Sequence, residues 1–510
     1  MPGRKSVCCA ARLVSLCLVV LALGLPGAVR EGTGVRESGP TGPVGAASFE
    51  VLAGQMGRAE AWYAIYGATL TGESTPARSG PPADVTPTLE RIAPVSRPSL
   101  SVTGTLTPTL HLPLVMRSPE LPMVERRALW ITRYDWTRLD EAPVPETIDA
   151  MVAKIAAAGF NTVFFQVRAA GDAYYTPGLE PWAARLSAGP ISETLGLDPG
   201  WDPLARMLTQ GHAAGLEVHA YVNVYTAWQS PSSADQGQLW PPATTPPQMF
   251  DLFTYGPSYL EHPGEYALGY SWRQYLEGSG LAGPQPMPLA PGQYLWASPG
   301  VALVADHVTA VVQDIVARYP VDGVHLDLVR YAGPGYSYDP YSNAAAGEAR
   351  TPARDQWQRD QVTALVQRLH DAVHDLRPAA EVSAAVWPYY LDAWGWGLTE
   401  GYTDYYQDSK GWLVSGAVDA IAPMLYGSVP DDLANWETLM RDFVDDAAGR
   451  PVYPGIGAHY DDFAAIAARI LTARVAGAPG HVIFSYGALE ARAYWDDLAG
   501  GPYQKPAILP

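Results

Sequence analysis

Beyond residue 123, short apolar runs of strand length alternate with stretches that have helical periodicity. The apolar runs predict eight strands, at 128–132, 161–168, 217–225, 321–331, 381–390, 420–427, 452–460 and 481–489. The stretches between them predict helices, among them 145–158, 202–214, 301–318, 356–376 and 463–476. Two of these helices run into a glycine just before the next strand, at Gly159 and Gly215, which is typical of the step from helix to strand in α/β units.

This alternation predicts an α/β fold, a (β/α)8 TIM barrel over residues 123–510. The strands are apolar almost throughout, as expected of parallel strands that are buried on both faces. A doubly wound open sheet is the alternative, but no strand is followed by the Gly-rich fingerprint of a dinucleotide fold. The loop after the third strand, 226–299, is unusually long, and loops of this length are often functional.

The first 122 residues follow a different pattern. Three basic residues precede an apolar run from Leu13 to Leu25 and a small-residue stretch, which predicts a secretory signal peptide over residues 1–28. A retained membrane anchor is the alternative, although the run is short for a membrane-spanning helix. Residues 29–122 are rich in Gly, Pro, Ser and Thr and are interpreted as a linker or stalk.

Charge and cysteine content narrow the function. The chain has 48% hydrophobic and 17% charged residues, as globular proteins do, and a formal net charge of −19. Such acidity disfavours nucleic acid and anionic membrane surfaces as partners. All three cysteines lie in the predicted signal peptide, at Cys8, Cys9 and Cys17. We therefore expect a mature protein without disulfides or thiol chemistry, outside the cytoplasm and without stable membrane insertion.

The segment from Arg127 to Leu489 resembles the glycosyl hydrolase-like 10 family of secreted bacterial barrels. The resemblance rests on RALWIT (127–132), FNTVFFQVRAAGDAYY (160–175), LDPGWDPLARMLTQGHAAGLEVHAYVNVY (197–225), VDGVHLDLVRY (321–331), GWLVSGAVDAIAPMLYG (411–427) and FSYGAL (484–489). It implies a barrel related to glycoside hydrolases, with relatives that act on bacterial cell-wall glycan. Many relatives carry a second carboxylate directly after the strand-four aspartate, where this sequence has Leu328.

Asp327 is the leading catalytic candidate. TIM-barrel active sites lie at the carboxyl ends of the strands, and alternation in the fourth strand places His325 and Asp327 on the face that points into the barrel. A carboxylate inside a barrel mouth is costly to desolvate unless it is paired or functional. The alternative is a structural acid held by Arg168 or Arg330, both of which are also candidate substrate-binding residues together with His325.

The second and third strands supply further candidates. Asp172 follows the second strand and is either a catalytic partner of Asp327 or a turn residue. In the third strand, Asn223 resembles a sugar-binding amide and Tyr225 follows it at the mouth, whereas His219 is expected to fill the core.

Glycoside hydrolysis usually requires two carboxyl groups, and the partner of Asp327 is not fixed by the sequence. Asp408 lies in a segment that matches the family, but it directly precedes the helix predicted at 409–415, where an N-cap aspartate is common. The remaining acidic candidates are Asp172, Glu400, Asp404, Asp461 and Glu490.

Aromatic residues near strand ends support a carbohydrate ligand, because flat rings stack on the C–H faces of sugars. Trp387 is the first choice and Tyr426 another. The histidines are scattered, and both HExxH and the combined paired-acid and HxxxH signature of metal-dependent deacetylases are missing, so no metal or other cofactor is expected. We expect a secreted or cell-surface glycoside hydrolase that binds a polysaccharide, with a non-catalytic glycan-binding barrel as the alternative. The oligomeric state stays open.

Overall fold

The computed structural model describes residues 122–231, 239–250, 272–278, 283–427 and 429–510. The predicted signal peptide lies outside these residues, as does the predicted linker apart from Pro122, and so do parts of the long loop at 226–299. None of the helices that the structure describes is long and apolar enough to cross a membrane.

Eight parallel strands form the centre of the protein, in the order β11-β10-β9-β4-β3-β2-β13-β12. Their bounds are β2 Arg126–Ile131, β3 Thr162–Arg168, β4 Glu217–Asn223, β9 Gly323–Asp327, β10 Glu381–Val386, β11 Ala420–Pro423, β12 Gly455–Gly457 and β13 Gly480–Phe484. The two outer strands also meet, through a parallel bridge between Ile421 and Val452, and the Tyr453 amide donates to the Ile421 carbonyl at 2.9 Å. The sheet is therefore a nearly closed barrel, as the sequence predicts.

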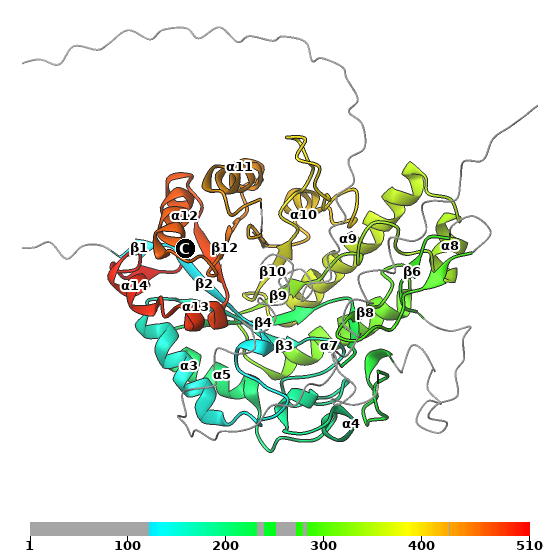
Figure 1. Ribbon diagram of the computed structural model, residues 1–510, viewed down its shortest axis with the longest axis horizontal. Helices are drawn as coiled ribbons and strands as arrows, with labels where there is room; N and C mark the ends of the chain where they lie inside the picture. Colours follow the sequence, from blue (N-terminus) through cyan, green and yellow to red (C-terminus); the bar gives the residue numbers. More distant parts are fainter. Residues whose placement is uncertain (1–121, 232–238, 251–271, 279–282, 428) are drawn as a thin grey trace, which may run out of the picture. The chain divides into compact units, whose positions relative to one another are not determined.

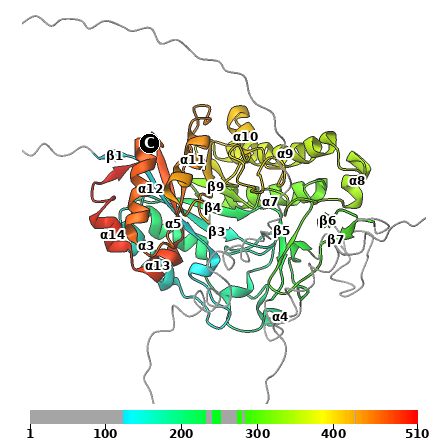
Figure 2. The ribbon, with the colours of Figure 1, turned by 45° about the horizontal axis from the view of Figure 1, so that its top comes forward.

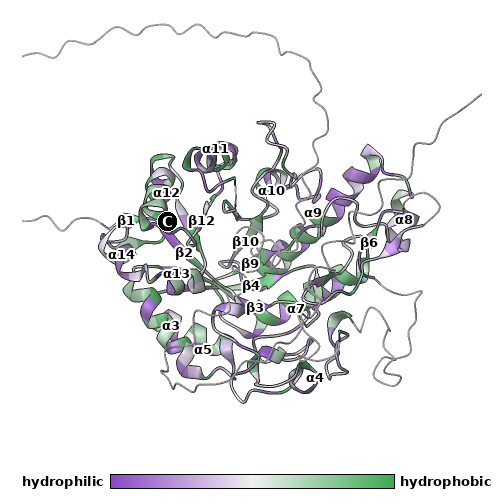
Figure 3. Cartoon of the chain, in the orientation of Figure 1, coloured by the Kyte–Doolittle hydropathy of each residue, from purple (hydrophilic) through white to green (hydrophobic). Residues whose placement is uncertain are grey.

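Helices cover the outside of the barrel (Figure 1). The helices that follow the strands in chain order are α3 Pro145–Ala157, α5 Pro203–Ala213, α7 Ala302–Arg318, α9 Pro352–Leu376, α10 Ser409–Ser415, α11 Leu433–Val444, α12 Phe463–Val475 and α13 Tyr486–Arg492. The central strands are mostly hydrophobic, whereas the surrounding helices are hydrophobic on one side only (Figure 3). Shorter helices are α4 Ile191–Thr194, α8 Pro340–Ala346 and α14 Trp495–Gly500.

The long loop after β4 contains small elements of its own. β5 (Thr226–Gln229) pairs antiparallel with β8 (Tyr294–Trp296), and β6 (Tyr275–Leu276) pairs with β7 (Gln285–Pro286). At the two ends of the barrel domain, β1 (Met123–Val124) pairs in parallel with β14 (Ala507–Ile508). In Figure 2, β1, α12 and α14 lie on the same side of the barrel, at the left of the view.

The predicted strands are correct in number and order, but all except 161–168 extend too far at their carboxyl ends. Leu328 has a φ of +49° and ends β9 at Asp327, earlier than the predicted end at residue 331. The last predicted strand, 481–489, is wrong over its second half, because Tyr486–Arg492 is helix α13. In both places the chain leaves the sheet to form the mouth of the barrel, although its apolar pattern continues.

At the amino end of the barrel, polar side chains tie neighbouring strands together. Asn161, Asp322 and Asp419 stand at the entry to β3, β9 and β11 respectively. Each accepts a hydrogen bond of 2.8 Å from a backbone amide near the start of the preceding strand in the barrel, donated by Arg127, Val218 and Val382 respectively. These side chains supply hydrogen-bond acceptors to amides at the end of the sheet, where the neighbouring strand offers no carbonyl.

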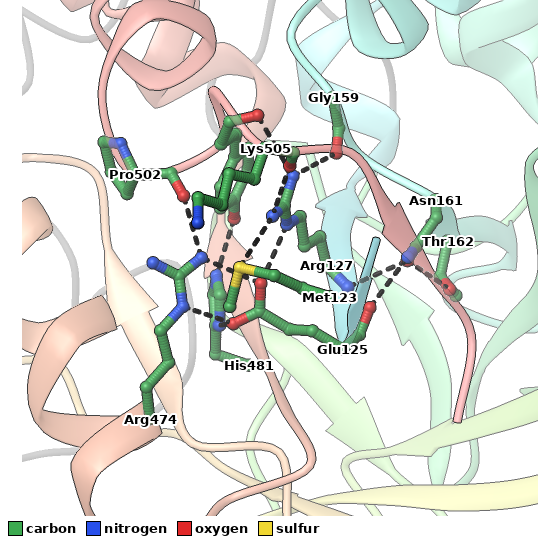
Figure 4. Close-up of polar contacts among 11 residues, drawn as sticks. Met123, Glu125, Arg127, Gly159, Asn161, Thr162, Arg474, His481, Pro502 and Lys505 are labelled. Carbon is green, nitrogen blue, oxygen red and sulfur yellow. Dashed lines mark hydrogen bonds and ion pairs between the residues drawn. The ribbon is translucent and has the colours of Figure 1, made fainter. Parts of the chain in front are cut away.

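Glu125 joins the start of the barrel to its end (Figure 4). Its carboxylate accepts from Arg127 Nε at 2.8 Å and from Arg474 Nε and Nη2 at 2.7 and 2.8 Å. Arg127 also donates to the Lys505 carbonyl at 2.9 Å, so β2, α12 and the C-terminal segment meet at one buried acid. Burial alone would raise the pKa of Glu125, but Arg474, His481 and Arg127 outweigh it and lower the pKa to about 2.

We predict that Glu125→Gln destabilises the protein by about 3–5 kcal/mol at pH 7, because it leaves two buried guanidinium groups without their counter-charge. The free energy of unfolding, measured by urea denaturation, should show this loss. Since folding lowers the pKa of Glu125, its contribution is present above pH 5 and is lost as the pH falls toward about 2. The difference between wild type and variant should therefore shrink at pH 3.

Glu437→Gln is the control, since Glu437 pairs with Arg441 on the exposed face of α11, with side chains 40% and 42% exposed. It should change the free energy of unfolding little. Equal losses in the two variants would contradict the special role of Glu125.

Candidate active site at the carboxyl ends of the strands

Asp327 is the last residue of β9 and its side chain lies inside the barrel, as the alternation predicts. It is 3% exposed. The Tyr221 hydroxyl donates to Oδ2 at 2.5 Å, and the Leu328 amide donates to Oδ1 at 2.6 Å. Both oxygens of the carboxylate are therefore held by donors, from β4 and from the chain that follows β9.

The Leu328 amide donates to the carboxylate of the residue directly before it, and the backbone turns sharply at Leu328. A φ of +49° places Leu328 in the left-handed region, which costs a residue with a Cβ about 1–2 kcal/mol. Unfavourable backbone conformations of this kind persist where surrounding structure enforces them and cluster at active sites.

His325 lies one layer deeper in the barrel than Asp327. Its Nε2 accepts a hydrogen bond from Trp130 Nε1 at 2.9 Å, its Nδ1 lies 2.9 Å from Ser383 Oγ, and its ring stacks on Phe164 at 4.0 Å. The indole N–H can only donate, so Nε2 carries no proton and Nδ1 donates to Ser383. Burial lowers the pKa of His325 well below its ordinary value. His325 is thus a neutral residue of the core.

Burial raises the pKa of Asp327, although the bonds from Tyr221 and Leu328 and the charge of Arg330 oppose this effect. The same is true of other acids at this end of the barrel. In the described part of the chain, four carboxyl groups have a raised pKa, and each lies at or beyond the carboxyl end of a strand: Asp135 after β2, Asp172 after β3, Asp327 on β9 and Asp404 after β10. Raised carboxyl pKa values are typical of active sites.

Asp135 is the member of this group that the sequence analysis missed. Its Oδ2 accepts from the Thr132 amide at 2.7 Å and its Oδ1 from Ser485 Oγ at 3.2 Å, which links the ends of β2 and β13. A Cβ at Gly487 would lie 2.4 Å from Oδ1, so the chain passes directly over the carboxylate. Burial raises the pKa of Asp135 to about 6. The Thr132-x-x-Asp135 spacing after the first strand was the available signal.

Asp172 combines features of both interpretations that the sequence leaves open. Its Oδ1 accepts a hydrogen bond from the Ala170 amide at 2.8 Å, which is a turn contact. Burial raises its pKa, and the positive charge of Arg133 opposes the shift. Its catalytic role remains a prediction.

Arg168 does not hold Asp327. Its guanidinium forms a two-pronged ion pair with Glu180, with Nε and Nη2 each 2.8 Å from a carboxylate oxygen, and both side chains are fully buried. Burial alone would raise the pKa of Glu180, but Arg168 and His307 lower it to about 2. Arg168 is therefore not the partner that would make Asp327 a structural acid, because Arg168 pairs with Glu180 from the loop after β3.

Arg330 follows β9 and is enclosed by aromatic rings. Its guanidinium carbon lies 5.0 Å from the ring centres of Trp296 and Trp387 and 4.6 Å from that of Tyr405. The rings supply cation–π attraction in place of a contacting carboxylate. Burial lowers the pKa of Arg330, and the nearby Asp327 opposes the shift.

The other candidate substrate-binding residues are also buried. Asn223 accepts from Gln166 Nε2 at 3.1 Å and donates to the Ala169 carbonyl at 2.9 Å. Trp387 is 6% exposed, with its indole N–H donating to the Thr399 carbonyl at 2.8 Å. Tyr225 and Tyr426 are 1% and 3% exposed. Tyr426 stacks on Phe484, and the negative charge of Asp327 adds to burial in raising its pKa, which places Tyr426 near Asp327.

Asp408 is the N-cap of α10, as its position directly before the predicted helix suggests. Its side chain accepts from the Gly411 amide at 3.0 Å and from the Tyr390 hydroxyl at 2.8 Å. Neither contact joins it to Asp327.

Sequence comparison relates the chain to one family of known proteins. A sequence profile of the glycosyl hydrolase-like 10 family matches residues 125–241 and 287–457. The chain belongs to this family. It is 26% identical over 348 residues to "Glycosyl hydrolase DigH" of Escherichia coli (strain K12), covering 62% of this chain and 69% of that protein. It is 25% identical over 354 residues to "Glycosyl hydrolase YngK" of Bacillus subtilis (strain 168), covering 65% and 60%.

Solved structures with a similar chain path include the glycoside hydrolase domain of PgaB (BpsB) from Bordetella bronchiseptica, with a TM-score of 0.45 and 13% identity over 74% of this chain and 99% of that one. Another is the catalytic domain of β-amylase from Paenibacillus polymyxa, with a TM-score of 0.46 and 13% identity over 75% and 98%.

We predict that Asp135→Asn changes how stability depends on pH. Folding raises the pKa of Asp135 from 3.8 to about 6, so its contribution to stability is greatest below pH 4 and is lost as the pH rises through 6. Asn cannot ionise. Relative to wild type, the variant should therefore gain roughly 1–3 kcal/mol in free energy of unfolding between pH 4 and pH 7.5.

The measurement is urea denaturation across this pH range, with Asp140→Asn as the control. Asp140 is an exposed acid in the same loop whose pKa is lowered by Arg138, so its replacement should add no pH dependence above pH 4. If the difference in free energy of unfolding between wild type and Asp135→Asn does not vary with pH, the pKa of Asp135 is not raised.

Proposed function

We propose that this protein is a secreted glycoside hydrolase that cleaves glycosidic bonds in a polysaccharide of the bacterial cell-wall glycan class. The observation that carries this proposal is the buried carboxylate of Asp327, held by two donors at the carboxyl end of a barrel strand. Membership of the glycosyl hydrolase-like family and the names of the two relatives support it. The signal-peptide pattern and the acidic charge support action outside the cytoplasm on an uncharged or cationic substrate.

In this proposal Asp327 acts in its ionised form. The Tyr221 hydroxyl and the Leu328 amide both donate to it, and such bonds stabilise a carboxylate over a carboxylic acid. The ionised group either attacks the anomeric carbon or removes a proton from the attacking water. A second carboxyl group must then protonate the departing oxygen, and Asp135, with a pKa of about 6, suits this task best near neutral pH.

The second candidate function is binding of glycan without cleavage. The observation that favours it is Leu328, which stands where many relatives carry a second carboxylate. Its test is the same as that of hydrolysis, because saturable glycan binding without release of reducing ends on any substrate would support a binding protein.

We predict that Asp327→Asn lowers the hydrolysis rate on the best substrate of a cell-wall glycan panel by at least about 10²–10⁴-fold. The amide keeps the volume and can still accept from Leu328, but it cannot attack or take a proton. Folding should be unaffected, with a melting temperature equal to or above that of wild type at pH 7, because the variant no longer places a charge in a buried position. Glycan binding should persist.

Asp408→Asn is the matched control, because Asn is as good an N-cap as Asp and Asp408 has no contact with Asp327. It should retain most of the hydrolysis rate. A folded Asp327→Asn protein with near-normal hydrolysis would remove Asp327 from the chemistry, and a large rate loss in Asp408→Asn would assign the partner carboxyl to Asp408.

We predict that Tyr221→Phe shifts the acid limb of the pH–rate profile to higher pH. The hydroxyl lowers the pKa of Asp327 against the effect of burial, so its removal raises that pKa further and a higher pH is needed to ionise the group. The rate at high pH should fall less than the rate at low pH. Unchanged pH dependence with a uniform rate loss would contradict the hydrogen bond as a determinant of ionisation.

A further inference from the structure

Two histidines and an aspartate meet at the amino end of the barrel, opposite the mouth. His370 and His374 lie one turn apart on α9, and their rings stack at 4.3 Å. Asp419, at the entry to β11, faces both: its Oδ1 lies 3.4 Å from His370 Nε2 and its Oδ2 lies 2.9 Å from His374 Nε2. One nitrogen of each histidine and one oxygen of Asp419 lie within 4.8 Å of one another.

The spacing of the two histidines corrects the sequence analysis. His370-x-x-x-His374 is an HxxxH pair, so these two histidines are not scattered. The sequence could not show that Asp419, 45 residues after His374, joins them. Only the return of the chain from α9 through β10 to β11 brings the three together.

A similar contact elsewhere in the barrel shows what the second histidine adds. At the entry to β9, Asp322 Oδ2 accepts from the Val218 amide at 2.8 Å and lies 2.8 Å from His212 Nε2 on α5. Asp419 Oδ2 likewise accepts from the Val382 amide at 2.8 Å and pairs with His374. One histidine is thus sufficient to hold the aspartate and the strand amide. His370 is additional, and it provides a third ligand atom.

We propose that His370, His374 and Asp419 form a binding site for a divalent transition-metal ion, with Zn²⁺ as the best-matched ion. Imidazole nitrogens and a carboxylate oxygen are zinc ligands, and three protein ligands leave a fourth tetrahedral position for water. The side chains are 17%, 31% and 27% exposed, so an ion can enter from solvent.

The geometry suits such an ion with small movements. Tetrahedral ligands with bonds of about 2.0–2.1 Å lie about 3.3–3.4 Å apart, which matches the 3.4 Å between His370 Nε2 and Asp419 Oδ1. His374 must leave its hydrogen bond with Oδ2, and the three ligand atoms, which lie within 4.8 Å of one another, must approach this spacing. His370 Nδ1 lies 3.3 Å from Asp371 Oδ1, the contact through which metal-bound histidines are usually oriented.

Arg450 opposes binding. Its Nη1 lies 3.5 Å from Asp419 Oδ1 and donates to the Val418 carbonyl at 3.0 Å. This positive charge repels a cation and competes for the same oxygen, and removal of the charge should therefore tighten the site.

The site lies at the amino ends of the strands, where TIM barrels carry stabilising rather than catalytic groups. A bound ion would fasten α9 to β11 and to the start of β10. It is therefore a structural site, and its existence does not depend on the proposed hydrolysis.

The test uses the tag-free secreted protein after removal of metal with a chelator. Titration calorimetry with Zn²⁺ at pH 7.5 should find one ion per chain at this site, and Zn²⁺ should raise the melting temperature. Loss of a residue that only hydrogen-bonds to a metal ligand weakens metal binding roughly 10–100-fold. His370→Gln and His374→Gln each remove a ligand itself and should weaken Zn²⁺ binding by more than this. Arg450→Gln should tighten binding. Co²⁺ in place of Zn²⁺ should give visible absorption typical of a tetrahedral site in wild type but not in the histidine variants.

His212→Gln is the matched control, because it removes the histidine of the contact with Asp322 and should leave Zn²⁺ affinity unchanged. Melting temperatures of the metal-free variants establish that each is folded. The proposal is overturned if metal-free wild type binds no Zn²⁺, or if His370→Gln binds it with wild-type affinity. It is equally overturned if His212→Gln weakens binding as much as His370→Gln does.

Discussion

The hydrogen bond from Trp130 to His325 shows the constraint on which the interior of this barrel depends. The interior of a parallel barrel offers little access to water, so polar groups that point inward are mostly satisfied by other inward groups. Trp130 on β2, His325 on β9 and Ser383 on β10 satisfy one another across the barrel, and the ring of Phe164 covers the imidazole. These neutral side chains lie one layer below the Asp327 carboxylate. Because His325 is neutral, it does not offset the cost of ionising Asp327.

Apart from Glu180, whose pKa is lowered by Arg168 and His307, the buried acids described above have lowered pKa values at the amino end of the barrel and raised values at its carboxyl end. At the amino end, Glu125 and Asp419 are ion-paired or bonded to backbone amides, and their pKa values are lowered. At the carboxyl end, Asp135 and Asp327 receive donors too, but burial prevails and their pKa values are raised. The first arrangement stabilises the fold at neutral pH, whereas the second costs stability there. Raised carboxyl pKa values that lie together at the carboxyl ends of the strands are typical of active sites.

Much of this structure follows from local pattern, and the remainder depends on contacts between distant segments. Eight apolar runs give the strands, and alternation correctly places His325 and Asp327 inside the barrel, because side-chain direction in a strand has a fixed period of two. The pairing of Arg168 with Glu180 could not be predicted, because it depends on the path of the loop after β3. The same holds for Asp419 beneath α9, which requires knowledge of how a helix packs on the next two strands. The ends of β9 and β13 were missed because their apolar pattern continues after the backbone has left the sheet.

Leu328 shows how such a site can tolerate a change of side chain. Its side chain is 1% exposed and packs in the core, so a carboxylate in the same orientation would be desolvated at considerable cost. The backbone is the part of this residue that acts on Asp327, because its amide N–H donates to Oδ1. That amide is present whichever residue occupies the position. The side chain at 328 can therefore vary without loss of the two donors that orient and stabilise the Asp327 carboxylate.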